Sequence, residues 1–400
     1  MPLPPVLALD GALRRYAWGS RTSIPGLLGQ TPDGEPVAEL WLGAHPDDPS
    51  AVPELGTTLD ELIAADPVTM LGTATVERFG SHLPFLLKVL AADTALSIQV
   101  HPTIEQARAG FSAEDARGVP RDAPGRNYRD ANHKPELLCA LSSFEALCGF
   151  RPIAGTLRLL DGLGVAELAP VSELLAGTDG LRAAFSYLLT LAEPARLVDA
   201  VLARCRRPVP EEWAGPVRAV RLAGTDFPGD VGAVLALLLN YVRLEPGEAI
   251  YLGAGNVHCY LRGMGVEIMA NSDNVLRCGL TAKHVDVPEL LAITEFSPLV
   301  EPRCPAEPRC PAEGRQSGTQ FRTPVADFNL SIVDLDADRG SCAVGGQGPH
   351  IVLCTEGQAQ LSHADASLRL TRGHAAFVAA GSSAFVVRGT GRVFIATVGG

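Results

Sequence analysis

The amino-acid sequence predicts a mainly β fold with a helical insertion, in which two jelly-roll barrels accompany an α-helical domain. Short apolar runs bounded by turn residues fill the first 150 residues and return after residue 240, as expected of β-strands. Between Gly155 and about Asn240 the apolar residues recur instead at helical spacing. A chain of 400 residues also exceeds the size at which one hydrophobic core keeps growing, so two or three domains are expected.

The two β regions contain a similar segment. Residues 247–255 align without gaps to residues 373–381, with four identities and one aromatic match. Turn–strand–turn units of this kind suit a jelly-roll barrel, because glycine permits the tight corners. Continuing the alignment places Ala384 opposite His258. If the segments are related, only the first barrel keeps a histidine that could bind metal.

Each predicted element follows from its local pattern. Strand-like runs occupy residues 83–90 and 95–102, and residues 136–150 are typical of two strands around Ser142 and Ser143. Pro and Gly divide the helical region into several helices. Strand-like sequence patterns return after residue 240, and short segments with alternating polarity, typical of strands, fill the C-terminal part.

The domain boundaries follow these changes in pattern. We expect residues 1–152 to form the first part of one barrel and residues 241–290 its second part, with a helical domain at 153–240 inserted between them. Residues 291–322 are predicted to be a linker, and residues 323–400 a C-terminal barrel without a metal site.

The linker carries a tandem repeat, EPRCPAEPRCPAE, over residues 301–313. Cys304 and Cys310 could be a metal-binding pair. However, their separation by five residues including proline is poor ligand spacing, and no histidine lies nearby. A surface loop lengthened by a short duplication is the favoured interpretation.

The composition favours a cytoplasmic protein that binds neither nucleic acid nor membrane. The net charge of −12 opposes the phosphate contacts of nucleic-acid binding, although a few converging cations could still hold one phosphorylated small molecule. The N-terminus lacks the pattern of a secretory signal, and no apolar run is long enough to span a bilayer. The nine cysteines form no C-x-x-C pair, as suits a reducing compartment. We expect a monomer or a weak homo-oligomer.

Four residues from three strand-like segments form a candidate metal site. Gln99 and His101 are two residues apart, so their side chains leave the same face of a strand. Glu136 and His258 each lie at a strand edge. One amide oxygen, one carboxylate and two imidazoles suit zinc with an open coordination position. Each motif alone also fits a solvated polar strand face, so the metal site depends on the strands being adjacent.

Several segments together resemble the successive signatures of the type I mannose-6-phosphate isomerases. They occur in the order of that family and end near His284: YAWGS (16–20), AELWLGAHP (38–46), LPFLLKVL (83–90), LSIQVHP (96–102), NHKPE (132–136), GNVHCYL (255–261) and NSDNVLRCGLTAKH (271–284). The combination of Q-x-H-P, H-K-P-E and S-D-N-V-x-R-x-G-x-T is specific. Ala282 and Cys259 depart from the usual family residues, but neither is a ligand.

The resemblance implies a cupin-type barrel that holds one zinc ion through Gln99, His101, Glu136 and His258. It also implies interconversion of mannose 6-phosphate and fructose 6-phosphate, a small-molecule phosphosugar reaction that passes through an enediol(ate). Two other classes stay open: a different metal-dependent cupin enzyme, and a non-catalytic sugar-binding cupin. The first would lack the H-K-P-E and S-D-N-V-x-R context, and the second would be expected to have lost ligands.

The other polar residues of these segments receive expected roles. Arg277 is predicted to stabilise the enediolate or hold the phosphate, with a pairing to Asp273 or Glu267 as the structural alternative. Lys134 and His133 are candidates for proton transfer or ring opening. The predicted substrate-binding residues are Lys88, Ser97 and Lys283, for the phosphate, and Glu267 and Asp273, which orient cations or ligands. Glu39, Trp41 and His45, with Trp18, are expected to be structural.

Overall fold

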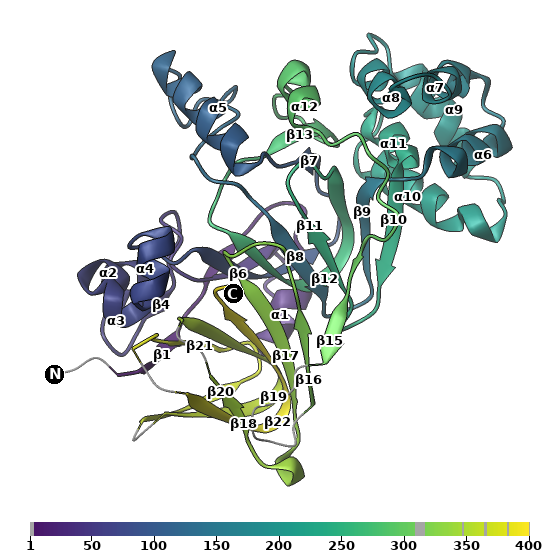
Figure 1. Ribbon diagram of the computed structural model, residues 1–400. Helices are drawn as coiled ribbons and strands as arrows, with labels where there is room; N and C mark the ends of the chain where they lie inside the picture. Colours follow the sequence, from purple (N-terminus) through teal and green to yellow (C-terminus); the bar gives the residue numbers. More distant parts are fainter. Residues whose placement is uncertain (1–3, 309–316, 346–347, 364–365, 382–383, 400) are drawn as a thin grey trace.

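The computed structural model describes residues 4–308, 317–345, 348–363, 366–381 and 384–399, and its architecture is mainly β (Figure 1). Two large sheets lie next to each other, and half of the described α-helices gather in one region beside the first sheet. The predicted fold class, mainly β with a helical insertion, is therefore confirmed. The closure of each sheet into a barrel stays a prediction.

The first sheet has eleven strands among the described residues, and every pairing within it is antiparallel. Its strands are β2 (Ala12–Arg14), β3 (Glu39–Leu42), β6 (Phe85–Ala92), β7 (Ile98–Val100), β8 (Glu136–Ala140), β9 (Phe144–Phe150), β10 (Leu239–Leu244), β11 (Ala249–Leu252), β12 (His258–Ala270), β13 (Leu276–Gly279) and β14 (Arg303–Cys304).

The long strand β12 connects two halves of this sheet. Near His258 it pairs with β7 and β9, and from Gly263 onward it pairs with β6 and β8. The change occurs at Gly263, where φ is +125° and a Cβ would lie 2.8 Å from the Cα of Phe144. Only glycine fits such a close approach with positive φ. This bend brings the start of β12 beside β7, where two predicted ligands lie.

The second sheet has nine strands in the described part of the chain, mostly from the C-terminal region: β1 (Val6–Leu9), β15 (Ala306–Pro308), β16 (Ser317–Phe321), β17 (Asn329–Leu335), β18 (Cys342–Val344), β19 (His350–His363), β20 (Ala366–Thr371), β21 (Ala375–Val378) and β22 (Phe385–Thr397). A separate two-stranded sheet joins β4 (Ala51–Val52) and β5 (Thr57–Thr58).

Two predicted domain boundaries need correction. The N-terminal strand β1 pairs with β21, so it belongs to the second sheet although residues 1–152 were expected in the first barrel. Strands β15 and β16 also join the second sheet, although residues 291–322 were expected to be a linker. The local sequence pattern predicts that a segment is a strand, but it does not determine which other strand that segment pairs with. Both assignments were wrong for this reason.

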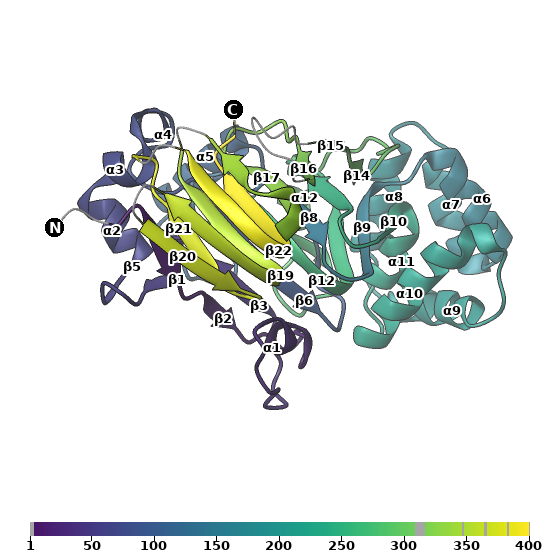
Figure 2. The same cartoon turned by 90° about the horizontal axis from the view of Figure 1, so that it is seen from below.

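The helices of residues 153–235 form a group at one end of the molecule, next to β9 and β10 (Figure 2). They are α6 (Ile153–Leu163), α7 (Ala169–Leu175), α8 (Gly180–Leu189), α9 (Ala195–Cys205), α10 (Ala214–Asp226) and α11 (Gly232–Leu235). In α6 the buried residues Leu159, Leu160 and Leu163 recur at helical spacing and share a core with Ile98 and Val100 of β7. The helical group thus supports the strand that carries Gln99.

The other α-helices of the described chain lie outside this group: α1 (Ser23–Leu27), α2 (Leu59–Ala65), α3 (Pro67–Leu71), α4 (Thr73–Phe79), α5 (Ile104–Ala116) and α12 (Val287–Ile293). Helix α5 begins at a capping box, in which Thr103 accepts the N–H of Gln106 and Gln106 accepts the N–H of Thr103. This cap ends the strand segment after His101 and turns the chain away from the sheet.

The second sheet packs on one face of the first. Alternate residues of β6, namely Phe85, Leu87 and Val89, share one hydrophobic core with Phe377 and Phe394 of the second sheet. Since side chains alternate along a strand, the intervening Lys88 points to the opposite face. Glu267 on β12 lies directly across from Lys88, so it leaves that same face. The polar residues of the first sheet therefore gather on the side away from the second sheet.

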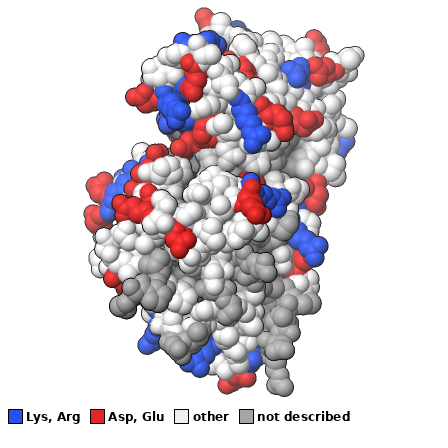
Figure 3. All heavy atoms as spheres, turned by 60° about the vertical axis from the view of Figure 1, so that its left-hand side comes forward, with Lys and Arg blue, Asp and Glu red and all other residues white. Residues whose placement is uncertain are grey.

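Every described cysteine is free and buried, and burial raises the pKa of the Cys148 thiol to about 12. Cys304 forms part of β14, while Cys310 lies outside the described residues. Within the part of the chain that the structure describes, no helix combines the length and apolar character needed to cross a bilayer. Acidic and basic side chains are interspersed over the face drawn in Figure 3.

Candidate functional site

The structure brings three of the predicted ligands together in the first sheet. His101 follows β7, Glu136 begins β8 and His258 begins β12. The Nε2 atom of His101 lies 3.4 Å from Oε1 of Glu136, and Nε2 of His258 lies 3.5 Å from Oε2 of the same carboxylate. All three side chains are buried, with exposed fractions of 0%, 2% and 0%. Their ligand atoms lie within 4.8 Å of one another.

Backbone carbonyl groups fix the tautomer of both rings. Nδ1 of His101 lies 2.8 Å from the carbonyl oxygen of Asn274, and Nδ1 of His258 lies 3.0 Å from that of Asn256. Because a carbonyl only accepts, each Nδ1 carries the proton and each Nε2 presents a lone pair toward Glu136. This arrangement is the one that orients histidine toward a metal ion.

Two buried atoms of this cluster have no hydrogen-bond partner among the described residues: Nε2 of His101 and Oε2 of Glu136. Burial disfavours charge on the His101 ring and lowers its pKa to about 4, so the ring is neutral near pH 7. Burial also opposes ionisation of Glu136, but its neighbours outweigh burial, among them the ammonium of Lys134, and hold the carboxylate pKa well below its usual range. A neutral imidazole and a carboxylate with unpaired acceptors, beside a second imidazole, fit a divalent cation.

Gln99, the fourth predicted ligand, reaches the same cluster. It lies opposite His258 in the β7–β12 pairing, and its Nε2 lies 3.1 Å from Nε2 of His258. The amide N–H therefore donates to the histidine. A half-turn of the amide would present Oε1 at the same place, as metal binding requires.

Lys88 is held in a buried network rather than facing open space. Its Nζ lies 3.6 Å from Oε1 of Glu39 and 3.6 Å from Oε2 of Glu267. Burial alone would lower the pKa of Lys88, but the charges of Glu39 and Glu267 outweigh it, so the pKa is raised and the ammonium stays protonated. Trp41 donates its Nε1–H to Glu39 at 2.8 Å. Glu39 was expected to be structural, yet it is one of the two carboxylates that pair with Lys88.

Glu267 is the member of this network whose pKa lies near neutrality. Tyr260 donates its hydroxyl to Oε1 of Glu267 at 2.7 Å. Burial and the charge of Glu136 raise the pKa of Glu267 to about 7, although Lys88 opposes them. A buried carboxyl with a pKa near neutrality can both give and take a proton, which suits acid–base chemistry.

Lys134 and His133 point in different directions although they are neighbours. Nζ of Lys134 lies 3.6 Å from Oε1 of Glu136, beside the predicted ligands. Nε2 of His133 lies 3.1 Å from Oδ1 of Asp327, which precedes β17 of the second sheet. The structure thus places Lys134 in the site and turns His133 toward the C-terminal region.

Arg277 belongs to a group of three cations near the predicted ligands. Burial lowers the pKa of Arg277, and the charge of Arg129 lowers it further. The charge of Arg277 is in turn the main cause that lowers the pKa of Lys283, followed by burial and by Arg129. None of the three is in an ion pair with a described carboxylate. The pairing of Arg277 with Asp273 or Glu267 is not seen, since those residues contact His45 and Lys88.

Arg129 is a site residue that the sequence reasoning missed. It lies shortly before Lys134, and its backbone N–H donates to Oδ1 of Asn274 at 2.7 Å. Its place in the polar loop before N-H-K-P-E was the available signal. Ser97, by contrast, was predicted, and it lies directly before β7, two residues from Gln99.

Asp230 supports the loop that follows Arg277. Leu280 has φ of +53°, a left-handed conformation that is costly for leucine. Oδ1 of Asp230 accepts the N–H of Leu280 at 2.9 Å, and Oδ2 accepts that of Thr281 at 3.3 Å. The helical region therefore holds the turn that leads to Lys283.

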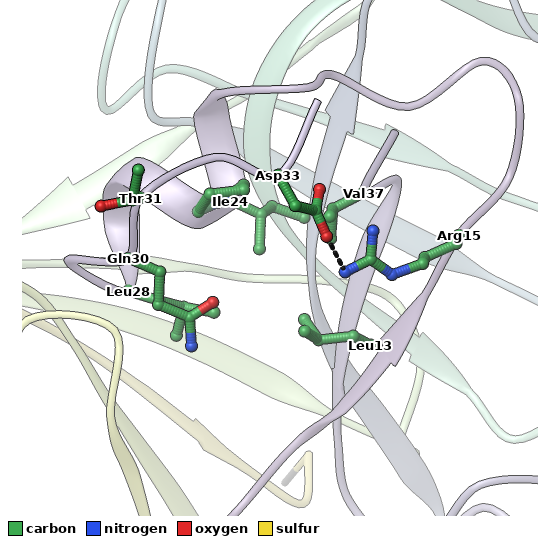
Figure 4. Close-up of a pocket in the computed structure, with 9 residues that line it drawn as sticks. Leu13, Arg15, Ile24, Leu28, Gln30, Thr31, Asp33 and Val37 are labelled. Carbon is green, nitrogen blue, oxygen red and sulfur yellow. Dashed lines mark hydrogen bonds and ion pairs between the residues drawn. The ribbon is translucent and has the colours of Figure 1, made fainter. Parts of the chain in front are cut away.

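Two further features are a second group of potential ligands and a small hollow. His45, Asp47 and Asp273 also bring potential ligand atoms within 4.8 Å, but Nδ1 of His45 already accepts the N–H of Asp47 at 3.2 Å. A hollow of about 30 Å³ lies at the N-terminal end of the chain, where Arg15 pairs with Asp33 at 2.9 Å (Figure 4). It has room for about one water molecule.

The chain matches known proteins over nearly its whole length. Residues 6–153 match the family model described as phosphomannose isomerase type I, catalytic domain, and residues 317–398 match the mannose-6-phosphate isomerase cupin domain. The mannose-6-phosphate isomerase of Escherichia coli is 39% identical over 390 residues, which cover 96% of this chain and 97% of that protein. The Mus musculus protein of the same name is 32% identical over 420 residues, covering 96% and 95%.

A solved structure is similar throughout. The crystal structure of mannose 6-phosphate isomerase from Salmonella typhimurium, bound to its substrate fructose 6-phosphate and to zinc, superposes with a TM-score of 0.90. It is 36% identical to this chain and covers 99% of it, and the match includes 100% of that chain.

Proposed function

The chain belongs to the type I mannose-6-phosphate isomerase family, and from that premise we propose that it is a zinc-dependent aldose–ketose isomerase. Its reaction is the interconversion of mannose 6-phosphate and fructose 6-phosphate. The observation that carries the proposal is the buried cluster of His101, Glu136 and His258, in which Nε2 of His101 and Oε2 of Glu136 have no hydrogen-bond partner among the described residues. Such atoms are costly to bury unless a cation satisfies them.

One zinc ion per chain would be held by His101, Glu136 and His258, with Gln99 as the fourth ligand. When bound, zinc supplies Lewis-acid polarisation and a template for the sugar oxygens. The neutral His101 ring and the ionised Glu136 carboxylate support this assignment, because metal ligands must be deprotonated at the binding atom.

The phosphate group is proposed to bind the cation cluster of Arg129, Arg277 and Lys283, with Ser97 as a hydroxyl donor. Burial and mutual repulsion together lower the pKa values of Arg277 and Lys283, and a dianion would relieve the repulsion. Lys88 was also expected to bind phosphate. Its position between Glu39 and Glu267 supports a role in holding those carboxylates instead.

Isomerisation moves one proton between C1 and C2 and another between their oxygens, so no redox cofactor is needed. The intermediate is an enediol(ate), whose developing negative charge requires nearby cations. We propose that Arg277 and Lys134 supply that charge stabilisation, and that Lys134 or Glu267 transfers the proton. The pKa of about 7 for Glu267 supports its candidacy, since it lies close to the operating pH.

Two measurements on the purified chain test the proposal. Elemental analysis should find one zinc per chain, and an isomerase assay should show turnover that is lost with a chelator and restored by zinc. Full turnover by a zinc-free chain would contradict zinc dependence. A zinc-loaded chain that binds but does not convert mannose 6-phosphate would instead indicate a sugar-binding cupin.

The free, buried cysteines support a cytoplasmic location.

A further inference from the structure

We infer that the C-terminal region contributes a positioning residue to the active site: Asp327 holds His133 and thereby places Lys134. The inference rests on the proposed function, in which Lys134 acts beside the metal ligands. It assigns the second sheet a part in the site beyond structural support.

The contact joins two parts of the chain that are distant in sequence. Oδ1 of Asp327 lies 3.1 Å from Nε2 of His133, across 194 residues of sequence. Asp327 is 7% exposed, so its carboxylate is largely removed from water. Its charge also contributes, after burial, to the raised pKa of Tyr251 on the neighbouring strand β11. A buried carboxylate at this place needs a partner, and His133 is the partner that the structure gives it.

Asp327 is itself held firmly. The next residue, Phe328, is fully buried in the core shared by the two sheets. Thr323 donates its hydroxyl to the carbonyl of Phe328 at 3.2 Å, and Gly399 donates its N–H to the carbonyl of Ala326 at 2.9 Å. The carboxylate therefore projects from a loop that is anchored at the neighbouring residues Ala326 and Phe328, as a positioning group must be.

The segment that carries His133 is anchored on its other side by Asn274. The amide Nδ2 of Asn274 donates to the carbonyl of Asp130 at 2.9 Å and to that of Asn132 at 2.8 Å. Between Asn132 and the strand β8, the side chain of His133 is tied to Asp327. The segment is thus fixed from both sides just before the predicted ligand Glu136.

Lys134 follows His133 directly, and its ammonium lies 3.6 Å from Glu136. Because neighbouring residues share a rigid peptide plane, a rotation at His133 displaces Lys134. A displacement of about 1 Å at a reacting group can reduce turnover by roughly 10²-fold.

The test compares Asp327→Ala with Asp327→Asn and with a control, Asp334→Ala. Asp334 lies on β17 of the same sheet and pairs at 2.7 Å with Arg392 of β22, also in the second sheet. We expect Asp327→Ala to lower kcat by about 10- to 100-fold with KM nearly unchanged and one zinc retained. Asp327→Asn keeps an oxygen that can accept from His133, so it should recover most of the lost kcat. The control should match the wild type in kcat.

A double substitution tests the route through His133. If Asp327 acts through that ring, adding His133→Ala to Asp327→Ala should lower kcat little further. Additive losses would overturn the inference, as would normal kinetics in a folded, zinc-loaded Asp327→Ala chain. Equal kcat losses in Asp327→Ala and the Asp334→Ala control would show a general effect of weakening the second sheet and would also overturn it.

Hydrogen exchange separates this inference from the proposed function, because it does not need activity. The peptide that covers residues 129–136 should exchange faster in Asp327→Ala than in the wild type or in Asp334→Ala. Unchanged exchange would refute the anchoring of His133 by Asp327. A wild-type chain with no isomerase activity would refute the proposed function, while the exchange result would still decide whether Asp327 anchors the segment.

Discussion

Arg277 lies directly opposite Gln99 across the β7–β13 ladder. Side chains of directly opposed residues leave the same face of a sheet, so the guanidinium of Arg277 and the amide of Gln99 are neighbours. On its other side Gln99 lies opposite His258 of β12. The register therefore places Arg277 one strand away from the predicted zinc ligands.

Replacing Arg277 by Ala should lower kcat and kcat/KM alike, by roughly 10²–10³, if the guanidinium meets charge that develops on the enediolate. Arg277→Lys should recover little, because an ammonium lacks the planar fork. Steady-state kinetics with zinc measured in the same sample provides the check. Normal zinc with near-normal values of both constants would show that Arg277 is only a structural strand residue.

Lys283→Ala should behave differently. If Lys283 holds only the phosphate, its contact is shared by the ground state and the transition state, so KM should rise while kcat changes little. The same assay with a substrate lacking the phosphate should show no difference between the variant and the wild type. A large fall in kcat with unchanged KM would contradict a phosphate role for Lys283.

Removing a histidine ligand should abolish both metal binding and turnover. In His101→Ala or His258→Ala the cluster loses one of its two imidazoles, and Glu136 keeps a buried charge with fewer partners. Elemental analysis and the isomerase assay measure the two effects together. A fully active His258→Ala protein without bound metal would refute the proposed zinc site.

The C-terminal region is predicted to bind no metal of its own. Ala384 stands in the aligned place of His258, and the two aligned segments contain β21 and β11. The wild-type chain should therefore hold one zinc, and His258→Ala should hold none. Tight binding of a second equivalent of zinc, retained in His258→Ala, would contradict this prediction.

The metal-free protein should show opposing pH effects of Glu267 and His101 on stability. The pKa of Glu267 is raised from 4.5 to about 7, so its stabilising contribution is complete below pH 4.5 and is lost as the pH rises to 7. The pKa of His101 is lowered from 6.5 to about 4, so its contribution is present above pH 6.5 and is lost as the pH falls to 4. Where the two pH ranges overlap, between pH 4.5 and 6.5, the two effects on stability nearly cancel.

The substitution Glu267→Gln removes the pH-dependent contribution of Glu267 to stability and leaves that of His101. The free energy of unfolding of this variant should then rise with pH more steeply than that of the wild type, by at most about 1.4 kcal/mol per pH unit. Urea unfolding in the presence of a chelator, repeated across this pH range, measures the difference. Parallel curves for the two proteins would show that Glu267 ionises normally.

Much of the site followed from the sequence because its signals are local. Alternation along one strand-like segment puts Gln99 and His101 on a common face whatever the rest of the fold does. The turn at Ser142 and Ser143 likewise separates β8 from β9, as the sequence predicted. Patterns within a few residues determine these features, so they could be read without knowing any distant contact.

The tertiary structure alone decided which distant residues meet. Strand β1 pairs with β21 at the other end of the chain, and His133 contacts Asp327 rather than the cluster beside Lys134. The sequence also did not predict the carboxylate partners of Lys88 or the proximity of Arg129 to Arg277. Such contacts depend on sheet packing and on distances between charges in space, and neither hydrophobic period nor residue spacing encodes those quantities.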